Sequence, residues 1–281
     1  MITRGTFEGI PFVIYIPDAF LEEQQLPLIS LFRAWPDEWF NTREDNSRGR
    51  RSVFTVITDL IQKGFLKPAA FLFPATACLQ SGEYYFADSV YAPAFRRSQS
   101  AFLTRQIFEQ GLLPYLKSLW PKLDIRRVAL DGFSLGGATA LTYAFANPAR
   151  YLSVGSFDAV LMDYERDHRL LNPNTPSDVT FQDFPYVYGD NPEPDWFRSV
   201  NPLDLIDHAD LPVYLYIVAS NDQSIQANAP RVVEFQKKMR RRGVTNYAAS
   251  PVLHPESSHE WYWVDEYLYR SLPFHTHALN G

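Results

Sequence analysis

The sequence is poor in cysteine and contains no long apolar run. Cys78 is the only cysteine among 281 residues, which excludes a disulfide framework within the chain and a metal site built from several thiolates. No apolar run approaches the roughly 20 residues that span a bilayer. The amino-terminal segment also lacks the apolar core of a signal peptide. These absences predict a soluble, cytoplasmic protein, although a mature chain whose signal peptide had been removed would look the same.

An excess of positive charge is missing too. The formal net charge is −6, a balance that argues against general nucleic-acid binding. Two basic runs, at 48–51 and 237–242, are expected to be solvated faces of a loop and a helix. Because 46% of the residues are hydrophobic and only 21% are charged, the chain has enough apolar side chains to build a folded core.

What the sequence does contain is an alternation of strand-like and helix-like segments. Such an alternation predicts an α/β fold, with a mostly parallel central sheet covered by helices on both faces. We expect one domain over 1–281, with an irregular insert at about 163–200 that is a candidate cap or lid. The expected strands are 6–17 (a strand or a hairpin), 26–34, 67–75, 126–131, 151–157, 211–220 and 245–253. The expected helices are 51–66, 101–121, 136–148, 201–209, 229–243 and 260–272.

One motif stands out, the stretch "GFSLGG" at 132–137 between a strand-like and a helix-like segment. A serine at such a junction lies on a tight turn at the carboxyl end of a strand, and side chains two residues away on either side would collide. Gly132 and Gly136 remove those side chains, and Gly137 lets the helix approach the sheet. Ser134 is therefore predicted to be a nucleophile, the alternative being a structural or phosphate-binding loop. Asp131 adjoins the turn but should point away from it, in a structural role.

A serine nucleophile needs a base and a carboxylate that orients the base. In this kind of fold they follow the serine in the order acid, then histidine. Asp222 follows the strand at 211–220, and His259 precedes the last helix. Asp158, which follows the strand at 151–157, remains a second candidate for the acid. His254 is the rival to His259, because it lies near the same loop.

Taken together, these segments resemble the bacterial esterase branch of the α/β-hydrolases, which includes esterase D-like enzymes, feruloyl and acetylxylan esterases, enterochelin esterase-like proteins and mycolyltransferases. The resemblance covers nearly the whole chain, and its specific parts are the serine turn and the histidine segment. It implies an α/β-hydrolase fold. The segments that carry it are "IPFVIYIP", "LPLISLFRAW", "FLTRQIFEQGLLPYLKSLWP", "VALDGFSLGGATALTYAFANPARY", "VNPLDLI", "LYIVASNDQS" and "SSHEWYWVDEYL".

The resemblance implies roles for individual residues. Ser134 would be the nucleophile, Asp222 the acid and His259 the base. The backbone N–H groups of Leu135 and Trp35 would form the oxyanion hole, the pair of donors that stabilises the negative oxygen of the reacting ester. No metal and no organic cofactor is implied.

The chain departs from the family pattern beside the expected oxyanion loop, where Arg33 and Ala34 replace His-Gly. Arg33 could bind an anionic group of the substrate, or it could form a structural ion pair with the 36–38 segment or the 43–51 loop. Asp158 stands where the family tends to have Ser-Gly. Trp261 is a further candidate for substrate binding, because aromatic rings can stack on sugars.

The sequence therefore predicts a serine esterase that cleaves a small-molecule or sugar ester through an acyl-enzyme intermediate. Three alternatives share the fold: an acyltransferase, an esterase acting on carbohydrates, and a binding protein that has lost catalysis. The sequence leaves the acyl group, the alcohol and the oligomeric state open. Neither nucleic acid nor a membrane is expected as a partner.

Overall fold

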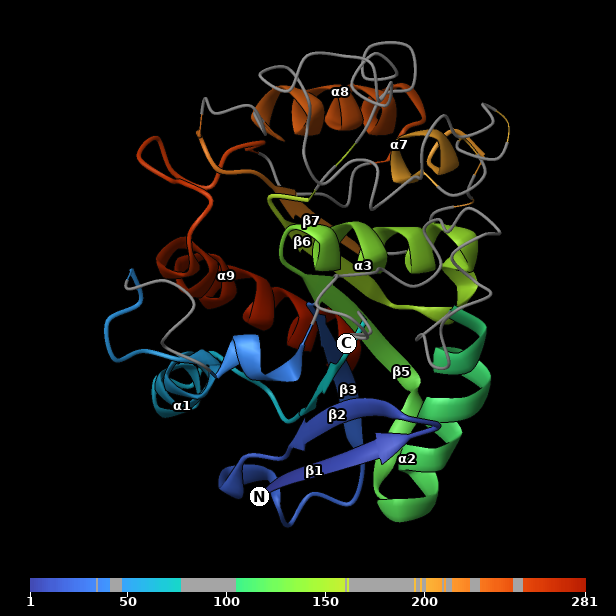
Figure 1. The fold of residues 1–281 in the computed structure, drawn as a ribbon, viewed down its shortest axis with the longest axis vertical. Helices are drawn as coiled ribbons and strands as arrows, with labels where there is room; N and C mark the ends of the chain where they lie inside the picture. Colours follow the sequence, from blue (N-terminus) through green and yellow to red (C-terminus); the bar gives the residue numbers. More distant parts are fainter. Residues whose placement is uncertain are drawn as a thin grey trace.

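The computed structural model describes most of the chain, and its described residues surround one seven-stranded sheet (Figure 1). Described are residues 1–33, 35–40, 47–76, 105–159, 161, 195, 198, 201–208, 210, 214–222, 228–244 and 250–281. Cys78 and nearly all of the 163–200 insert lie outside these residues. The role of the insert as a lid therefore remains a prediction.

The sheet has the order β1-β2-β4-β3-β5-β6-β7. Its strands are β1 (Ile2–Phe7), β2 (Ile10–Tyr15), β3 (Leu26–Phe32), β4 (Ala70–Pro74), β5 (Leu123–Gly132), β6 (Ser153–Phe157) and β7 (Tyr214–Val218). The first two form an antiparallel hairpin, and β2 pairs with β4 in antiparallel fashion. From β4 to β7 all pairings are parallel. The predicted, mostly parallel sheet is confirmed.

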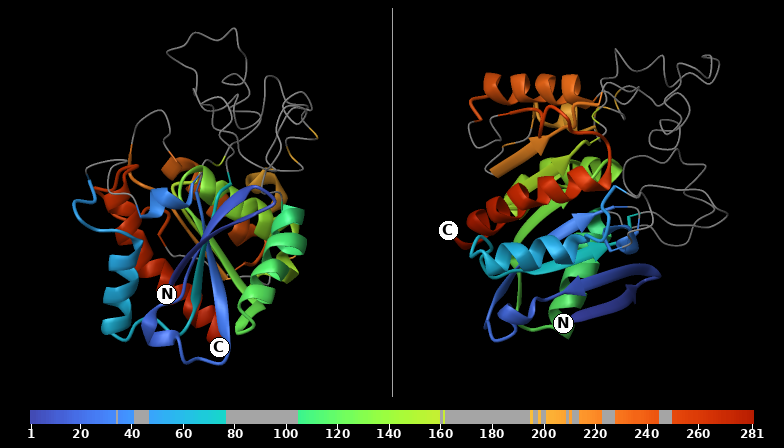
Figure 2. Two further views of the ribbon diagram at one scale, coloured as in Figure 1. Left: turned by 60° about the horizontal axis from the view of Figure 1, so that its bottom comes forward. Right: turned by 90° about the vertical axis from the view of Figure 1, so that its left-hand side faces the viewer.

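Helices cover both faces of this sheet, as predicted (Figure 2). The described helices of four or more residues are the 3-10 turn η2 (Pro36–Trp39), α1 (Val53–Gln62), a π-helical turn at Ile107–Leu112, α2 (Leu113–Leu119), α3 (Leu135–Ala146), α7 (Pro202–Leu205), α8 (Asn228–Arg241) and α9 (Trp261–Asn280). Helices α1 and α9 lie on one face, and α2 and α3 lie on the other. Because β3 and β4 are covered from both sides, every residue in them is buried.

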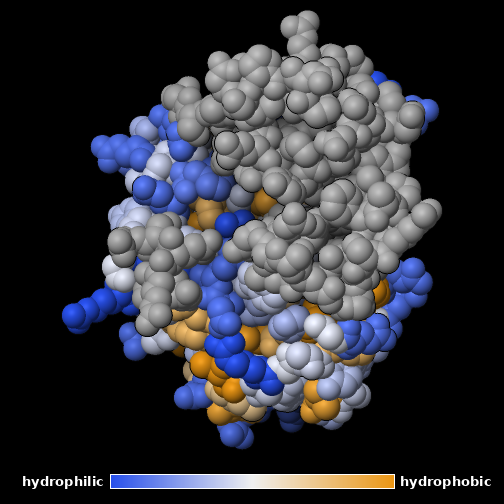
Figure 3. Space-filling model, in the orientation of Figure 1, coloured by the Kyte–Doolittle hydropathy of each residue, from blue (hydrophilic) through white to orange (hydrophobic). Residues whose placement is uncertain are grey.

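The hairpin end of the sheet is less completely covered. Every residue of β1 is exposed or half-buried, and Ile2 is among the exposed hydrophobic residues. At the lower end of the molecule in Figure 3, hydrophobic and hydrophilic residues are interspersed over the described surface. Among the described residues, no helix is both long and apolar enough to cross a membrane.

The carboxyl-terminal part of the chain differs from the sequence prediction in two places. Helix α9 continues through Pro273 to Asn280, whereas the predicted helix ends at 272. Proline ordinarily ends a helix because it lacks an N–H donor, but burial of His275 and Leu279 holds the following turns against the sheet. Of the strand predicted at 245–253, only residues 250–253 are described, and there Val252 forms an isolated bridge to Ala219.

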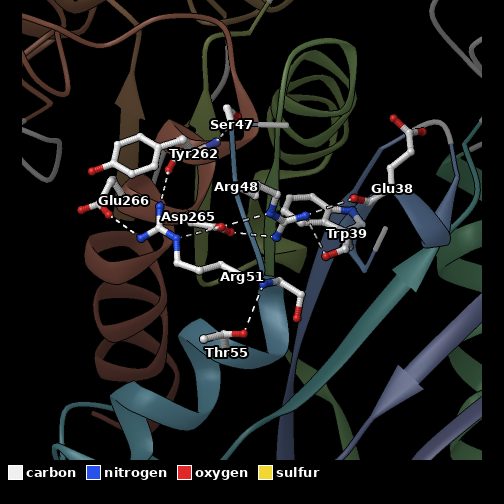
Figure 4. A network of polar contacts seen from close by, with 10 residues as sticks. Glu38, Trp39, Ser47, Arg48, Arg51, Thr55, Tyr262, Asp265 and Glu266 are labelled. Atoms are coloured by element: carbon white, nitrogen blue, oxygen red, sulfur yellow. Dashed lines mark hydrogen bonds and ion pairs between the residues drawn. The ribbon is translucent and has the colours of Figure 1, made fainter. Parts of the chain in front are cut away.

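The basic run at 48–51 is not wholly a solvated loop face, and Arg48 corrects that prediction. The Arg48 guanidinium forms a two-pronged contact with Asp265 of α9, at 2.8 and 3.0 Å, and both side chains are fully buried (Figure 4). Arg48 also donates to the backbone oxygens of Glu38 and Trp39. Since removing one partner of a buried pair leaves an uncompensated charge, this contact joins the segment after β3 firmly to α9.

Helix α3 packs unusually closely on the ends of β3 and β5. A Cβ atom built on Gly136 would lie 1.9 Å from the backbone oxygen of Phe32, and one on Gly132 would lie 2.4 Å from the backbone oxygen of Gly136. Neither contact is possible for real atoms, so only glycine permits this approach. A Cβ atom on Gly137 would meet Ser156 Oγ at 2.9 Å, a milder conflict with the end of a side chain.

We therefore expect Gly136→Ala to lower the free energy of unfolding by about 3 kcal/mol, at the upper end of the cost of overpacking a core. Gly137→Ala, the same change one residue along the same helix, should cost about 1 kcal/mol or less, because the higher helix propensity of alanine offsets part of the strain. Urea unfolding of both variants and the wild type measures the difference. Equal stability of the two variants would contradict the proposed close approach.

Candidate active site

Ser134 lies between the carboxyl end of β5 and the start of α3, on a backbone with φ 57° and ψ −122°. A positive φ is costly for a residue with a side chain, so the surrounding contacts must hold this conformation. The Ser134 N–H donates to the backbone oxygen of Phe157 at the end of β6. The predicted tight turn, with the glycines that make it possible, is confirmed.

The first turn of α3 lies directly beside Ser134. Leu135 is the first residue of the helix, directly after Ser134. A helix amino terminus carries partial positive charge and N–H groups that lack partners within the helix. The Leu135 N–H is therefore in the right part of the fold to stabilise an oxyanion, and its role stays a prediction.

Asp158 lies at the end of β6, the strand next to β5, and is the carboxylate that contacts His259. The distance between His259 Nδ1 and Asp158 Oδ2 is 2.5 Å. Ser220 donates its N–H to Asp158 Oδ1 and its hydroxyl to Oδ2. Burial alone would raise the pKa of Asp158, but the hydrogen bond and charge of His259, together with the two donors of Ser220, hold it below the usual range. Asp158 is thus a buried, ionised carboxylate that fixes the imidazole.

The structure corrects the choice of Asp222 as the partner of His259. Asp222 follows β7 as expected, and its N–H lies 3.4 Å from Ser220 Oγ. Ser220, two residues earlier, donates directly to Asp158. The loop after β7 therefore supplies hydrogen-bond donors to the carboxylate that contacts His259, while the loop after β6 supplies that carboxylate.

His259 is held beside the serine turn by an aromatic contact as well. Its ring centroid lies 4.6 Å from that of Phe133, the residue before Ser134. The turn that precedes His259 is fixed by Asn221, whose side chain donates to the backbone oxygen of Pro255. These contacts bring the predicted nucleophile and base to neighbouring positions at the carboxyl edge of the sheet.

The rival histidine, His254, has a different environment. It is exposed and stacks on Trp263 with centroids 5.2 Å apart. Its Nδ1 accepts the N–H of Glu256, and its backbone oxygen accepts the hydroxyl of Ser257. These contacts give His254 a role in shaping the turn before His259.

The expected oxyanion loop contains a carboxylate, Glu38, whose contact with Trp35 was not predicted. The Trp35 N–H, predicted to be an oxyanion donor, donates instead to Glu38 Oε1 at 2.6 Å. Glu38 Oε2 lies 2.7 Å from Arg33 Nε, and the two side chains are only 14% and 16% exposed. The ion pair between Arg33 and the 36–38 segment, one of the two predicted roles of Arg33, is therefore present. The Arg33 guanidinium also lies over the Phe133 ring, 5.0 Å from its centroid.

Trp261 is a buried residue that packs against the serine turn and the segment after β3. It is 2% exposed and packs edge-on against Trp39 and Phe133, with centroids 5.2 and 5.3 Å apart. The Arg48 guanidinium lies over its ring at 4.7 Å. These contacts make Trp261 a packing residue in the structure and leave it almost no surface for a ligand.

A second arrangement of serine, histidine and aspartate occurs deeper in the molecule. Ser153 Oγ lies 2.6 Å from His275 Nδ1, and His275 Nε2 lies 3.0 Å from Asp131 Oδ2. Tyr267 donates to the other oxygen of Asp131. Ser153, His275 and Asp131 are all fully buried, so no ester could reach the serine. The predicted structural role of Asp131 is confirmed, since it anchors α9 on the sheet.

The sequence contains few signals that predict the contacts of Ser220 and Glu38. Ser220 lies in the same loop as Asp222, and only the fold shows which of them turns inward. Glu38 belongs to a short acidic stretch, "PDE", that is typical of surface turns. Within the described residues, no group of three or more histidine, cysteine, aspartate or glutamate side chains is arranged to hold a metal ion.

Comparisons with solved structures agree with the fold of this chain. A ferulic acid esterase superposes with a TM-score of 0.67 at 18% identity, over 99% of this chain and 97% of its own. S-formylglutathione hydrolase from Agrobacterium tumefaciens gives a TM-score of 0.64 at 15% identity, covering 99% and 94%. A ferulic acid esterase from Anaeromyces mucronatus gives 0.65 at 15% identity, covering 100% and 91%.

At these identities the likeness establishes the fold, so the predicted α/β-hydrolase fold is confirmed. A search of curated protein sequences found no significant match. The model of one protein family, described as "Putative esterase", matches residues 6–274, almost the whole chain. On this match, and in agreement with the resemblance read from its sequence, the chain belongs to that esterase family.

Proposed function

We propose that this carboxylic ester hydrolase works through an acyl-enzyme intermediate, with Ser134 as nucleophile, His259 as base and Asp158 as the acid that orients the base. The observation that carries the proposal is the contact between His259 Nδ1 and the buried Asp158, beside the strained turn that presents Ser134. A hydroxyl becomes a useful nucleophile only when a positioned imidazole accepts its proton.

In this mechanism Asp158 holds the proton of His259 on Nδ1, so that Nε2 is the basic nitrogen. His259 takes the proton of Ser134 as the serine oxygen attacks the ester carbonyl. The oxyanion is stabilised by the Leu135 N–H and by the Trp35 N–H when that donor is available. His259 then returns the proton to the departing alcohol, and water repeats the cycle to release the acid.

The packing contacts favour a supporting role for two other residues. Arg33 is assigned the ion pair with Glu38 in place of substrate binding. Trp261 is assigned the packing of Phe133, the residue before Ser134. The substrate is proposed to be a small-molecule or sugar ester. An acyltransferase remains the second candidate, because it would use the same residues and differ only in the acceptor of the acyl group.

Ser134→Ala should lower kcat for nitrophenyl acetate by about a million-fold, to the level left by binding and the oxyanion hole alone. Labelling by a fluorophosphonate probe should be lost as well. Ser153→Ala, which removes the serine of the buried network, is the matched control and should keep the probe labelling. Retention of labelling in Ser134→Ala would contradict the assignment of the nucleophile.

The assignment of the acid can be tested by a pair of isosteric changes. Asp158→Asn should lower kcat by roughly 10⁴-fold, because an amide favours the wrong histidine tautomer, while Asp222→Asn should change kcat less than about threefold, a surface-like effect. Steady-state kinetics at one pH, with the fold checked by circular dichroism, compares the two. A larger loss in Asp222→Asn would return the acid role to that residue.

A further inference from the structure

The contacts of Glu38 carry an inference that rests on the function proposed above. Its Oε1 accepts a hydrogen bond from the Trp35 N–H at 2.6 Å, and its Oε2 forms an ion pair with Arg33, whose Nε lies 2.7 Å away. A carboxylate held by a backbone N–H and an arginine is bound as an anionic ligand would be. Here the ligand is part of the chain itself.

This bound carboxylate lies beside the serine turn. Arg33 follows β3, and a Cβ atom built on Gly136 would lie 2.9 Å from the backbone nitrogen of Arg33. The Arg33 guanidinium covers Phe133, whose ring also touches His259. The segment that carries Trp35 and Glu38 therefore runs alongside the first turn of α3, where the oxyanion is expected to form.

We propose that Glu38 is an internal blocker of the second oxyanion donor, and that an ester must displace its carboxylate from the Trp35 N–H before this donor can act. While Glu38 stays in place, the donor is engaged and a negative charge lies where another negative charge must develop. Both effects oppose the transition state. Because Glu38 Oε2 contacts Arg33, the ion pair provides a place for the carboxylate to remain after Oε1 has left the N–H.

The alternative is that Glu38 only caps the short helical turn η2 (Pro36–Trp39), in which it is the third residue. The two roles predict opposite kinetics. Loss of a cap would loosen the oxyanion loop and slow hydrolysis, whereas loss of a blocker would free the Trp35 N–H and speed hydrolysis. Stability does not separate the two roles, since both allow a lower melting temperature.

Glu38→Ala should raise kcat/KM for nitrophenyl acetate about tenfold, the order of the effect of a hydrogen bond to a charged group. Glu38→Gln keeps an acceptor of the same shape without the charge, so its rise should be smaller, on the order of threefold. If Glu38→Ala fails to fold, Glu38→Gln alone decides the matter. A kcat/KM at or below that of the wild type in the folded variants would overturn the proposal.

A free carboxylate provides a second readout. In Glu38→Ala, sodium acetate should occupy the vacated position and inhibit hydrolysis competitively, when compared with sodium chloride at the same ionic strength. The wild type should be insensitive to acetate at these concentrations, because Glu38 already holds the position. Equal acetate sensitivity of the variant and the wild type would contradict the inference.

Asp37→Asn is the matched control. Asp37 is the neighbouring acid of the same turn, but it pairs with Arg4 on the surface, where both side chains are more than 60% exposed. This variant should show wild-type kinetics and no inhibition by acetate. A wild type that hydrolyses no ester and is not labelled at Ser134 would count against the proposed function itself, whereas an active wild type with unaltered Glu38 variants would count against the blocker alone.

Discussion

The close approach of α3 to the ends of β3 and β5 is the constraint on which the site depends. Glycines at 132 and 136 leave backbone atoms in direct contact where any side chain would collide. This contact forces Ser134 into a positive φ and directs the amino terminus of α3 at the same point. The strain is balanced by a hydrogen bond from the Ser134 N–H to β6. The position of Ser134, the proposed nucleophile, and the direction of the first turn of α3 therefore have one common origin.

The carboxylate of Asp158 shows how neighbouring strands contribute to one polar network around His259. Asp158 ends β6 and, like Ser134, has a positive φ, which turns its carboxylate toward His259. The loop after β7 contributes Ser220, whose two donors satisfy the buried carboxylate and help to keep it ionised. Arg48 donates to the backbone oxygen of Glu38 and to Asp265, and so connects the expected oxyanion loop with the helix that follows His259. The residues around the candidate site thus come from five separate loops, joined by buried polar contacts.

Much of this arrangement was predictable from the sequence. The alternation of segments predicted the sheet and its helices, and the glycines around Ser134 predicted the tight turn. The order of the segments also predicted the position of His259 near the serine turn. Asp222 was favoured over Asp158 as the partner of His259, and the order of segments could not separate them, because both aspartates follow strands that end at the same edge of the sheet. The ion pair of Arg33 with the 36–38 segment was one of two predicted roles, but the contact of Glu38 with the Trp35 N–H was missed, since it depends on a side-chain conformation in a short turn. The end of α9 was misplaced because Pro273 is a local signal, whereas burial of His275 is a property of the whole fold.

The buried network around Asp131 has a consequence for the order in which the chain can fold during its synthesis. Asp131 lies in the middle of the chain, but Tyr267 and His275, which satisfy its carboxylate, belong to the last helix. Until that helix has left the ribosome, the carboxylate has to remain hydrated, and the adjacent face of the sheet cannot close. A nascent chain therefore completes this part of its core only after α9 has emerged, and His259 emerges immediately before that helix.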